Sequence, residues 1–336
     1  MSMRVAVVGA GSWGTTLAAR CARRGAATLW ARRPELAAEV DAARVNAAYL
    51  PGVVLPPSLE VTASLERAVA GAELVLLAVP TRGMRATAAA LAGAVAPGVP
   101  VVSLAKGLEA GTRRRMSEVV AEELPGHPVG VLTGPNLSHE IAAGRPAAAV
   151  VAVEDHDVAE AVGATLRDDV FRVYTNHDVV GCEVAGALKN VIAIAAGMAA
   201  GLGTGDNALA AVITRGLAEL TRLGVAMGGE AQTFAGLAGV GDLVATCTSG
   251  HSRNRWVGEQ LGRGRSLAEA TAELPGVAEG VATSAVVVQL AAELGVEVPL
   301  SEEVRAVCHD GRSAREAYRR VLARDGGAEV RGLARR

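Results

Sequence analysis

A glycine-rich turn near the start of the chain constrains its fold more than any other feature. The segment GAGSWG, with Gly9, Gly11 and Gly14, fits GxGxxG, follows the apolar run Arg4–Val8 and opens a helical pattern over Trp13–Arg24. In such a strand–turn–helix unit the first glycine permits the tight turn, and the second lets a pyrophosphate approach the backbone. The third lets the helix pack closely on the strand, and the N-terminus of the helix faces the anion. The turn therefore predicts a dinucleotide site.

Apolar runs and helical patterns alternate through the first half of the chain, as in a parallel sheet covered on both faces. We expect strands at Arg4–Val8, Ala27–Trp30, Leu74–Val79, Val101–Leu104, Val129–Thr133, Ala147–Val153 and Val170–Tyr174. This pattern predicts an α/β fold, with a doubly wound, Rossmann-type parallel sheet in a dinucleotide-binding domain over residues 1–178.

The pattern changes after Asp178, where strand alternation is absent. Helical spacing runs over Glu183–Met198, Leu209–Leu223, Arg255–Leu261, Ala282–Leu294 and Glu302–Leu322. We therefore expect an all-helical substrate and catalytic domain over residues 179–336. The loop GLGTGDN from Gly201 joins two of these helices, and Asp206 or Asn207 is expected to cap the second.

Composition excludes several classes of partner. A formal net charge of −2 and 2% aromatic residues argue against nucleic acid. Lys189, Asp206 and Glu219 interrupt the longest apolar stretches, which we interpret as buried core, with no stable membrane insertion. The four widely spaced cysteines fit free thiols in a reducing cytoplasm, and nothing resembles a signal peptide. No paired ligand spacing predicts a metal.

The residues at the end of the second predicted strand indicate whether the cofactor is NAD or NADP. An acidic residue there reads the ribose 2′-hydroxyl of NAD. This chain has Arg32 and Arg33 instead, which suit the extra phosphate of NADP. A solvated charge pair is the alternative in an arginine-rich chain. We expect NADP(H) to be preferred, with NAD(H) possible.

Lysine is nearly absent, which draws attention to the two that occur. Among 33 basic residues only Lys106 and Lys189 are lysines. Arginine keeps its proton at working pH, whereas lysine can release it, and burial lowers the pKa of lysine. Lys189 is a lone charge on an apolar helix, so it is the candidate proton donor, with snorkelling to the surface or pairing with a carboxylate as alternatives.

The chain resembles the bacterial-type NAD(P)-dependent glycerol-3-phosphate dehydrogenases from end to end. The matching segments are GAGSWGTTLA from Gly9, YLPG from Tyr49, AVP from Ala78, LAKGLE from Leu104, LTGPNLSHE from Leu132, EVAGALKN from Glu183, GLGTGDN from Gly201, GVGDLVATCTSGHSRN from Gly239 and GVAEG from Gly276.

The resemblance implies interconversion of dihydroxyacetone phosphate and sn-glycerol 3-phosphate, supply of the product to phospholipid synthesis, and a homodimer. It implies that Lys189 and Asp242 are catalytic. The implied substrate contacts are Lys106, Gly134, Asn136, Lys189, Asp242, Ser252, Arg253 and Asn254. The implied cofactor contacts, with the three glycines of the turn, are Ser12, Trp13, Arg32, Arg33, Lys106, Ser138, Arg253, Val277 and Glu279.

Physical chemistry agrees with these assignments. An ammonium at Lys189 can stabilise and then protonate a developing alkoxide, and Asp242 can orient it or hold a substrate hydroxyl. Ser252-Arg253-Asn254 offers a hydroxyl, a guanidinium and an amide in a row for a phosphate. A helix cap beside a surface arginine is the alternative for this triplet, and a helix or turn cap is the alternative for Asp242.

Two segments depart from the family pattern. Asn136-Leu137-Ser138-His139 replaces a small hydroxyl residue, an aromatic, a small residue and a lysine, so the Asn136 contact is less secure than that of Lys106. Asn46-Ala47-Ala48 replaces a more usual proline-containing approach to YLPG.

Two rival functions remain. One is a dehydrogenase of β-hydroxyacids or sugar acids with a similar helix lysine. The other is a non-catalytic dinucleotide sensor, against which the joint presence of Lys106, Lys189 and Asp242 argues.

Overall fold

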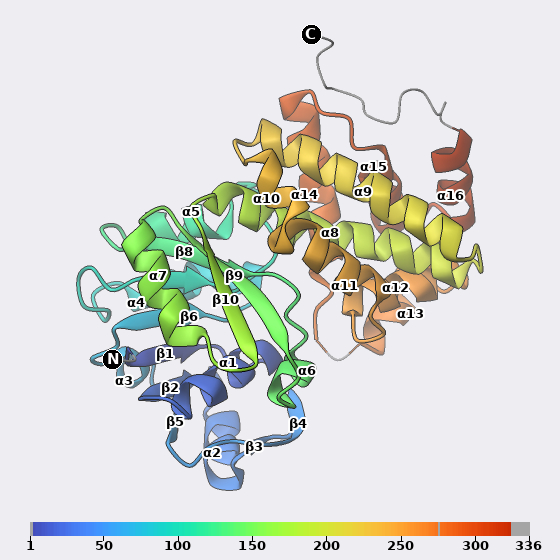
Figure 1. Cartoon of the computed structure of the whole chain (residues 1–336). Coiled ribbons are helices and arrows are strands. Elements are labelled where there is room, and N and C mark those ends of the chain that lie inside the picture. Colours follow the sequence, from blue (N-terminus) through green and yellow to red (C-terminus); the bar gives the residue numbers. More distant parts are fainter. Residues whose placement is uncertain (1–2, 275, 324–336) are drawn as a thin grey trace. The chain divides into compact units, whose positions relative to one another are not determined.

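The computed structural model describes residues 3–274 and 276–323 (Figure 1). The chain forms two compact units. The first comprises Met1–Ala105 with Arg114–Val179, and the second comprises Lys106–Arg113 with Val180–Arg336. The short segment Lys106–Arg113 thus belongs with the helical half, although both of its flanks in the sequence belong to the first unit. The predicted functional division at residue 178 stays a prediction.

The first unit is built on an eight-stranded sheet with the order β10-β9-β8-β7-β6-β1-β2-β5. Its strands are β1 (Val5–Val8), β2 (Ala27–Trp30), β5 (Leu59–Thr62), β6 (Leu74–Leu77), β7 (Val101–Ser103), β8 (Val129–Thr133), β9 (Ala147–Val153) and β10 (Phe171–Asn176). The helices of this unit are α1 (Ser12–Ala22), α2 (Pro34–Ala43), α3 (Leu65–Val69), α4 (Thr81–Leu91), α5 (Met116–Glu123), α6 (Ser138–Ala142) and α7 (His156–Leu166).

Alternate residues of the central strands pack into two separate cores. Val5 and Val7 of β1 join one core with residues of α1, α2, α6 and α7, whereas Ala6 and Val8 join another with residues of α3, α4 and α5. Successive side chains of a strand point to opposite faces, so each face of this sheet carries its own layer of helices. The predicted doubly wound fold is confirmed.

The sheet differs from the prediction in two respects. β8 and β9 pair antiparallel, while β9 and β10 pair parallel, so the two strands at one end of the sheet, β9 and β10, run opposite to the other six. An antiparallel neighbour needs only a short connection, and here it is a loop with the five-residue helix α6. The sequence analysis also missed β5 and the two-stranded hairpin of β3 (Val45–Asn46) and β4 (Leu50–Val54), because these segments lack a continuous apolar run.

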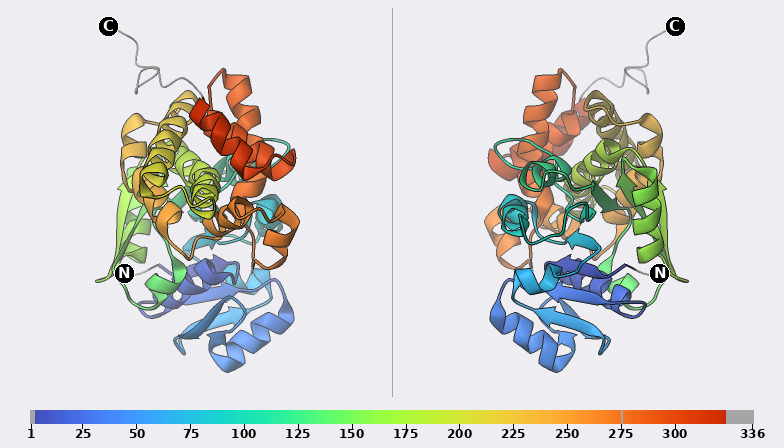
Figure 2. Two further views of the ribbon diagram at one scale, coloured as in Figure 1. Left: turned by 90° about the vertical axis from the view of Figure 1, so that its right-hand side faces the viewer. Right: turned by 90° about the vertical axis from the view of Figure 1, so that its left-hand side faces the viewer.

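The second unit, over its described residues, contains helices and no strand, as predicted (Figures 1 and 2). It contains α8 (Val179–Gly201), α9 (Asp206–Ala226), α10 (Ala231–Ala235), a π-helical turn η1 (Leu237–Gly241), α11 (Asp242–Thr248), α12 (Arg253–Gly262), α13 (Leu267–Ala272), α14 (Glu279–Leu294), α15 (Pro299–His309) and α16 (Ala314–Ala323). Among the described helices only α8 is long and apolar enough to cross a membrane, and 94% of that apolar window is buried in the unit.

Two details of the helical half were predicted wrongly. Glu302–Leu322 is not one helix, because α15 ends at His309 and Gly311, with a φ of 72°, turns the chain before α16. The expected side-chain cap at Asp206 or Asn207 is also wrong, since Gly205 is the N-cap of α9 and Asp206 is its first residue. Gly205 has a φ of 84°, which favours glycine over a capping side chain there.

Candidate functional site

The glycine turn of the first unit has the geometry that its sequence predicts. Gly9 has a φ of 121°, and a Cβ there would lie 2.5 Å from the carbonyl oxygen of Ala78. A Cβ on Gly14 would lie 2.0 Å from the carbonyl oxygen of Gly9. Both glycines are therefore required by close backbone contacts within the protein.

Gly11 is different, because it faces open space. No protein atom lies within 4 Å of the position that its Cβ would take. Gly11 is also the N-cap of α1, where no side chain caps the helix and the first turn carries no acidic residue. The backbone N–H groups at this helix end are thus free of any side-chain cap, as in helix ends that bind an anion such as a pyrophosphate.

Other predicted cofactor and substrate residues of the first unit lie on α1, α6 and the loop before α6. Ser12 and Trp13 begin α1, and the Trp13 ring packs edge-on against Phe171. Ser138 begins α6, and its carbonyl oxygen accepts a hydrogen bond from Thr16 of α1 at 3.4 Å.

Two of these residues hold buried polar atoms without a partner. The amide nitrogen and oxygen of Asn136 and the indole nitrogen of Trp13 make no hydrogen bond within the described part of the chain. Buried polar groups are usually satisfied by protein, water or ligand, so these atoms are candidates for contact with a ligand or a bound water. Gly134, with a φ of 109°, makes the turn after β8 that leads to Asn136.

Arg32 and Arg33 lie just beyond the carboxyl end of β2, and both are exposed. Neither forms an ion pair with a described residue, and Arg33 makes one long hydrogen bond, at 3.4 Å, to the Tyr49 hydroxyl. Unpaired guanidinium groups at this edge of the sheet fit an added phosphate.

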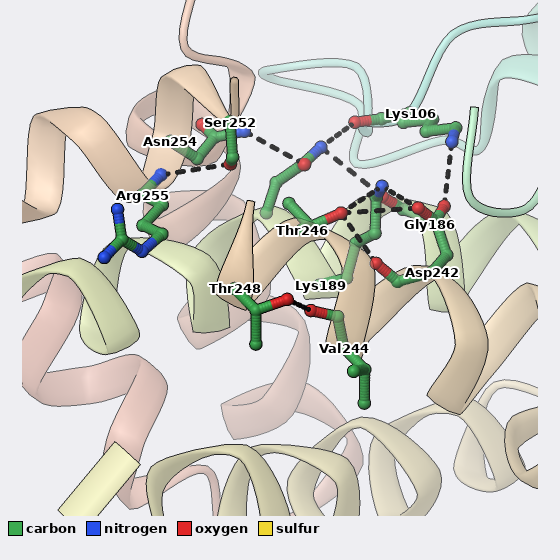
Figure 3. A network of polar contacts seen from close by, with 11 residues as sticks. Lys106, Gly186, Lys189, Asp242, Val244, Thr246, Thr248, Ser252, Asn254 and Arg255 are labelled. Carbon is green, nitrogen blue, oxygen red and sulfur yellow. Dashed lines mark hydrogen bonds and ion pairs between the residues drawn. The ribbon is translucent and has the colours of Figure 1, made fainter. Parts of the chain in front are cut away.

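The second unit brings the two lysines together on one carboxylate (Figure 3). Lys189 of α8 and Asp242 of α11 are 5% and 1% exposed. Lys189 Nζ donates to Asp242 Oδ1, and Lys106 Nζ donates to Asp242 Oδ2 at 2.8 Å. Lys189 Nζ also donates to the Thr246 hydroxyl at 2.7 Å. Asp242 is therefore not acting as a helix cap, and Lys189 does not snorkel but pairs with a carboxylate, the other alternative for its sequence.

This geometry leaves one proton of the Lys189 ammonium without an acceptor among the residues that the structure describes. An ammonium has three donors, and two of them bind Asp242 and Thr246. Within the described residues no acceptor takes the third. When Lys189 is neutral, the same two bonds keep its N–H groups in place, so its lone pair takes the direction of the third donor.

A second row of hydrogen bonds joins the loop of Lys106 to α8, α12 and α14. Asn190 donates to the carbonyl oxygen of Lys106 at 2.8 Å, and Asn254 donates to the amide oxygen of Asn190 at 2.9 Å. The backbone N–H of Gly280 then donates to Asn254 at 3.0 Å. This row fixes the main chain at Lys106 relative to the helix that carries Lys189.

Burial and charge set the protonation of the network. Burial is the main cause that lowers the pKa of Lys189 from 10.5 to about 7; the charge of Lys106 adds to it and Asp242 opposes it. For Asp242, burial alone would raise the pKa, but the charges and hydrogen bonds of Lys106 and Lys189 outweigh it, so the pKa is lowered. Asp242 therefore stays ionised, whereas Lys189 gains or loses its proton near neutral pH.

The Ser252-Arg253-Asn254 triplet opens α12. The Ser252 hydroxyl caps this helix by accepting from the backbone N–H of Arg255 at 3.2 Å. Ser252 and Arg253 line a hollow of about 270 Å³ whose other lining residues are Gly250, His251, Trp256, Glu273 and Leu274. A Cβ on Gly276 would lie 2.5 Å from the Arg253 guanidinium, which places that group beside the segment leading to Val277 and Glu279.

Helices α8 and α12 approach each other through glycines. A Cβ on Gly197 of α8 would lie 2.0 Å from the carbonyl oxygen of Arg255, and one on Gly258 of α12 would lie 2.0 Å from that of Ile194. One turn further along, a Cβ on Gly201 would lie 2.3 Å from the carbonyl oxygen of Glu259, and one on Gly262 would lie 2.5 Å from that of Met198. Backbone contact therefore sets the spacing between the helix of Lys189 and the helix that Arg253 begins.

Sequence reasoning missed Thr246 and Asn190 as members of the network. Asn190 follows Lys189 directly, and its side chain faces the Lys106 loop. Thr246 is four residues after Asp242, a spacing that places both on one face of α11, but this signal has meaning only once α11 is known to pack against α8.

Comparisons with known proteins agree on one family. A family model described as the NAD-dependent glycerol-3-phosphate dehydrogenase N-terminus matches residues 4–159, and the corresponding C-terminus model matches residues 178–319. A glycerol-3-phosphate dehydrogenase (NAD(P)+) from Sphingopyxis alaskensis is 48% identical over 98% of this chain and 99% of its own. One from Mycobacterium avium is 50% identical over 98% and 97%.

Solved structures give the same result. Glycerol-3-phosphate dehydrogenase from Coxiella burnetii superposes with a TM-score of 0.92 at 37% identity, over 96% of this chain and 99% of its own. The enzyme from Saccharomyces cerevisiae superposes with a TM-score of 0.83 at 28% identity, over 96% and 99%.

Proposed function

The chain belongs to the NAD-dependent glycerol-3-phosphate dehydrogenase family, and from this membership we propose which of its residues perform the family reaction. It is an oxidoreductase that interconverts dihydroxyacetone phosphate and sn-glycerol 3-phosphate with a nicotinamide cofactor. The observation that supports the assignment of roles is the buried network in which Asp242 holds both Lys106 and Lys189.

Lys189 is the proton donor and acceptor. During reduction the C2 carbonyl oxygen gains negative charge, which the Lys189 ammonium stabilises and then neutralises by giving up its third proton. During oxidation the neutral amine takes the proton of the C2 hydroxyl. A pKa of about 7 lets Lys189 serve in both directions.

Asp242 and Lys106 prepare Lys189 for this role. The Asp242 carboxylate, with Thr246, fixes the direction of the remaining proton. Lys106 keeps Asp242 ionised and adds positive charge that favours the neutral form of Lys189. With Gly134 and Asn136, Lys106 also contacts the substrate.

The phosphate of the substrate binds at the start of α12. Capping uses the Ser252 oxygen as an acceptor, so its hydroxyl proton stays available to a phosphate oxygen. Arg253 offers its guanidinium fork, and the helix N-terminus adds a favourable dipole. Asn254 contributes by fixing Asn190.

The cofactor supplies or accepts a hydride at C2 when bound. The turn of Gly9, Gly11 and Gly14 would hold its pyrophosphate, and Arg32 and Arg33 would bind the 2′-phosphate of NADP, so we propose that NADP(H) is preferred and NAD(H) possible. The other cofactor contacts are Ser12, Trp13, Lys106, Ser138, Arg253, Val277 and Glu279.

We also propose a biological setting, on the basis of the product and of the family resemblance. A cytoplasmic homodimer that makes glycerol 3-phosphate supplies the backbone for phospholipid synthesis, and no metal takes part.

The test follows absorbance of NADPH, and then NADH, with dihydroxyacetone phosphate, in wild type and Lys189→Ala. We expect rapid oxidation by wild type and a loss of about 10³-fold in kcat in the variant with unchanged NADPH binding, the scale of general acid catalysis. Undiminished turnover in Lys189→Ala would move the proton donor elsewhere. Activity with 3-hydroxy acids and none with dihydroxyacetone phosphate would favour the hydroxyacid alternative.

The cofactor preference needs its own variant. Replacing Arg32 and Arg33 with glutamine should raise the KM for NADPH and leave that for NADH nearly unchanged. Equal or better use of NADH by wild type would contradict the proposed preference.

A further inference from the structure

Asn46 is a polar residue that is buried at the end of β3, just before a run of exposed residues. It is 0% exposed, whereas Ala47, Ala48 and Tyr49, which follow it, are all exposed. The pairing of β3 with β4 changes register between Val45 and Asn46. Such an irregularity changes the direction of a side chain, and here the Asn46 amide points into the interior of the first unit.

The side-chain amide of Asn46 forms a hydrogen bond with the main chain of the glycine turn. Its nitrogen donates to the carbonyl oxygen of Ala10 at 3.0 Å and to the hydroxyl of Thr15 at 2.8 Å. Its oxygen accepts from the backbone N–H of Tyr49 at 3.3 Å. The Tyr49 bond identifies which end of the amide is oxygen, so the donor end faces Ala10.

This contact determines how the turn presents its own donors. The carbonyl of Ala10 and the N–H of Gly11 belong to one planar peptide unit, in which they point in opposite directions. A hydrogen bond that holds the carbonyl toward Asn46 therefore holds the Gly11 N–H away from the protein interior. Gly11 is the residue of the turn that faces open space.

We propose that Asn46, which lies outside the glycine motif, is a positioning residue that orients the Ala10–Gly11 peptide toward the cofactor pyrophosphate. The inference rests on the proposed dinucleotide site but not on the roles of Lys189 or Asp242. It predicts that Asn46 affects pyrophosphate binding selectively and leaves binding of the adenosine end intact.

The test compares Asn46→Ala and Asn46→Asp with Leu55→Ala, by fluorescence titration of NADPH and by competition with adenosine 2′-monophosphate, which has no pyrophosphate. Leu55 is a core residue, 1% exposed, just beyond β4, so its truncation destabilises the same region and removes no hydrogen bond to the turn. We expect about a tenfold weaker affinity for NADPH in Asn46→Ala, the effect of one lost, well-placed hydrogen bond donor. Asn46→Asp should be weaker still, because it replaces the donor with an acceptor facing the Ala10 carbonyl. Affinity for adenosine 2′-monophosphate should be nearly unchanged in both.

Three results would overturn the inference. The first is unchanged NADPH affinity in folded Asn46→Ala and Asn46→Asp. The second is a loss of affinity for adenosine 2′-monophosphate equal to that for NADPH, and the third is an equal loss of NADPH affinity in Leu55→Ala at a matched fall in Tm. Wild type that binds NADPH but fails to reduce dihydroxyacetone phosphate would refute the proposed catalysis and leave this inference supported by the titrations. Wild type that binds no NADPH would overturn both.

Discussion

Thr246 accepts a hydrogen bond from Lys189 at 2.7 Å while its hydroxyl proton goes to the main-chain carbonyl of Asp242, 2.6 Å away. The hydroxyl is thus held as an acceptor, and it fixes one of the three donors of the ammonium (Figure 3). Thr246→Val keeps the shape of the side chain and removes this acceptor. We expect kcat to fall about tenfold and the pKa in the kcat profile to move down, since a bond to the charged form of Lys189 is lost.

Thr248 provides a matched control for this variant. Its hydroxyl makes the same kind of bond, to the carbonyl oxygen of Val244 at 2.8 Å, but it is exposed and touches neither lysine. Thr248→Val should leave both kcat and the pH profile unchanged. A profile that does not move in Thr246→Val, or one that moves equally in both variants, would show that Thr246 does not orient Lys189.

The pH dependence of the two reaction directions should be opposite. Reduction needs Lys189 charged, so its kcat should fall as pH rises through about 7, whereas oxidation needs Lys189 neutral, so its kcat should rise over the same range. Initial rates in both directions between about pH 6 and about pH 9 would reveal this. Inflections of the same sign in both directions would contradict the assignment.

Glu219 of α9 stabilises the start of α15. Its carboxylate accepts from the backbone N–H groups of Leu300 at 2.5 Å and of Ser301 at 3.1 Å, and from the Ser301 hydroxyl at 3.0 Å. These groups have no partner within their own helix, so Glu219→Ala should lower the free energy of unfolding by about 2 kcal/mol. Ser301→Ala, which loses only the hydroxyl bond, should cost less, and equal losses in urea unfolding would contradict this account.

The same carboxylate makes stability depend on pH. Burial is the main cause that raises the pKa of Glu219 from 4.5 to about 7. The folded chain then binds a proton more tightly than the unfolded chain, so the contribution of this group is complete below about pH 4.5 and declines as pH rises to about 7. Glu219→Gln should flatten the dependence of unfolding free energy on pH over that interval.

The glycine contact between α8 and α12 predicts a combined effect on stability and catalysis. Gly258→Ala would place a Cβ against the carbonyl oxygen of Ile194, so the helices must separate. We expect a loss of about 1–3 kcal/mol, the range for overpacked cores, together with a higher KM for dihydroxyacetone phosphate. Gly83→Ala in α4, where the Cβ meets open space, should stabilise or leave stability unchanged. A well-folded Gly258→Ala enzyme with normal KM would contradict the proposed spacing role.

Most of the fold could be predicted because buried parallel strands and core helices carry strong apolar patterns. The misses occur where tertiary contact decides the outcome. β5 is a four-residue edge strand in which only the two end residues, Leu59 and Thr62, are buried, and the break before α16 depends on one glycine in a polar stretch. The antiparallel direction of β9 has no local signature, since the same apolar run suits either direction.

In the candidate site, too, some residues could be predicted from the sequence, whereas their contacts could not. Lys106 and Lys189 stood out because the chain otherwise uses arginine, yet the sequence did not predict that one carboxylate would bind both. Ser252 was expected to bind a ligand or to cap a helix, and its hydroxyl caps α12 while lining the hollow beside Arg253. Contacts among residues far apart in sequence, such as Lys189 with Thr246, required the structure.

The segment Lys106–Arg113 makes the helical unit discontinuous in sequence. Leu108 lies in the hydrophobic core of that unit, and Lys106 binds Asp242. A chain that begins at residue 179 would therefore lack part of its own core and one of the two cations on its buried carboxylate. Exchange of domains between related dehydrogenases would meet the same obstacle. A single crossover near residue 178 would combine the helical unit of one enzyme with the Lys106–Arg113 segment of another. A functional chimera therefore needs three junctions, at 105/106, 113/114 and 179/180.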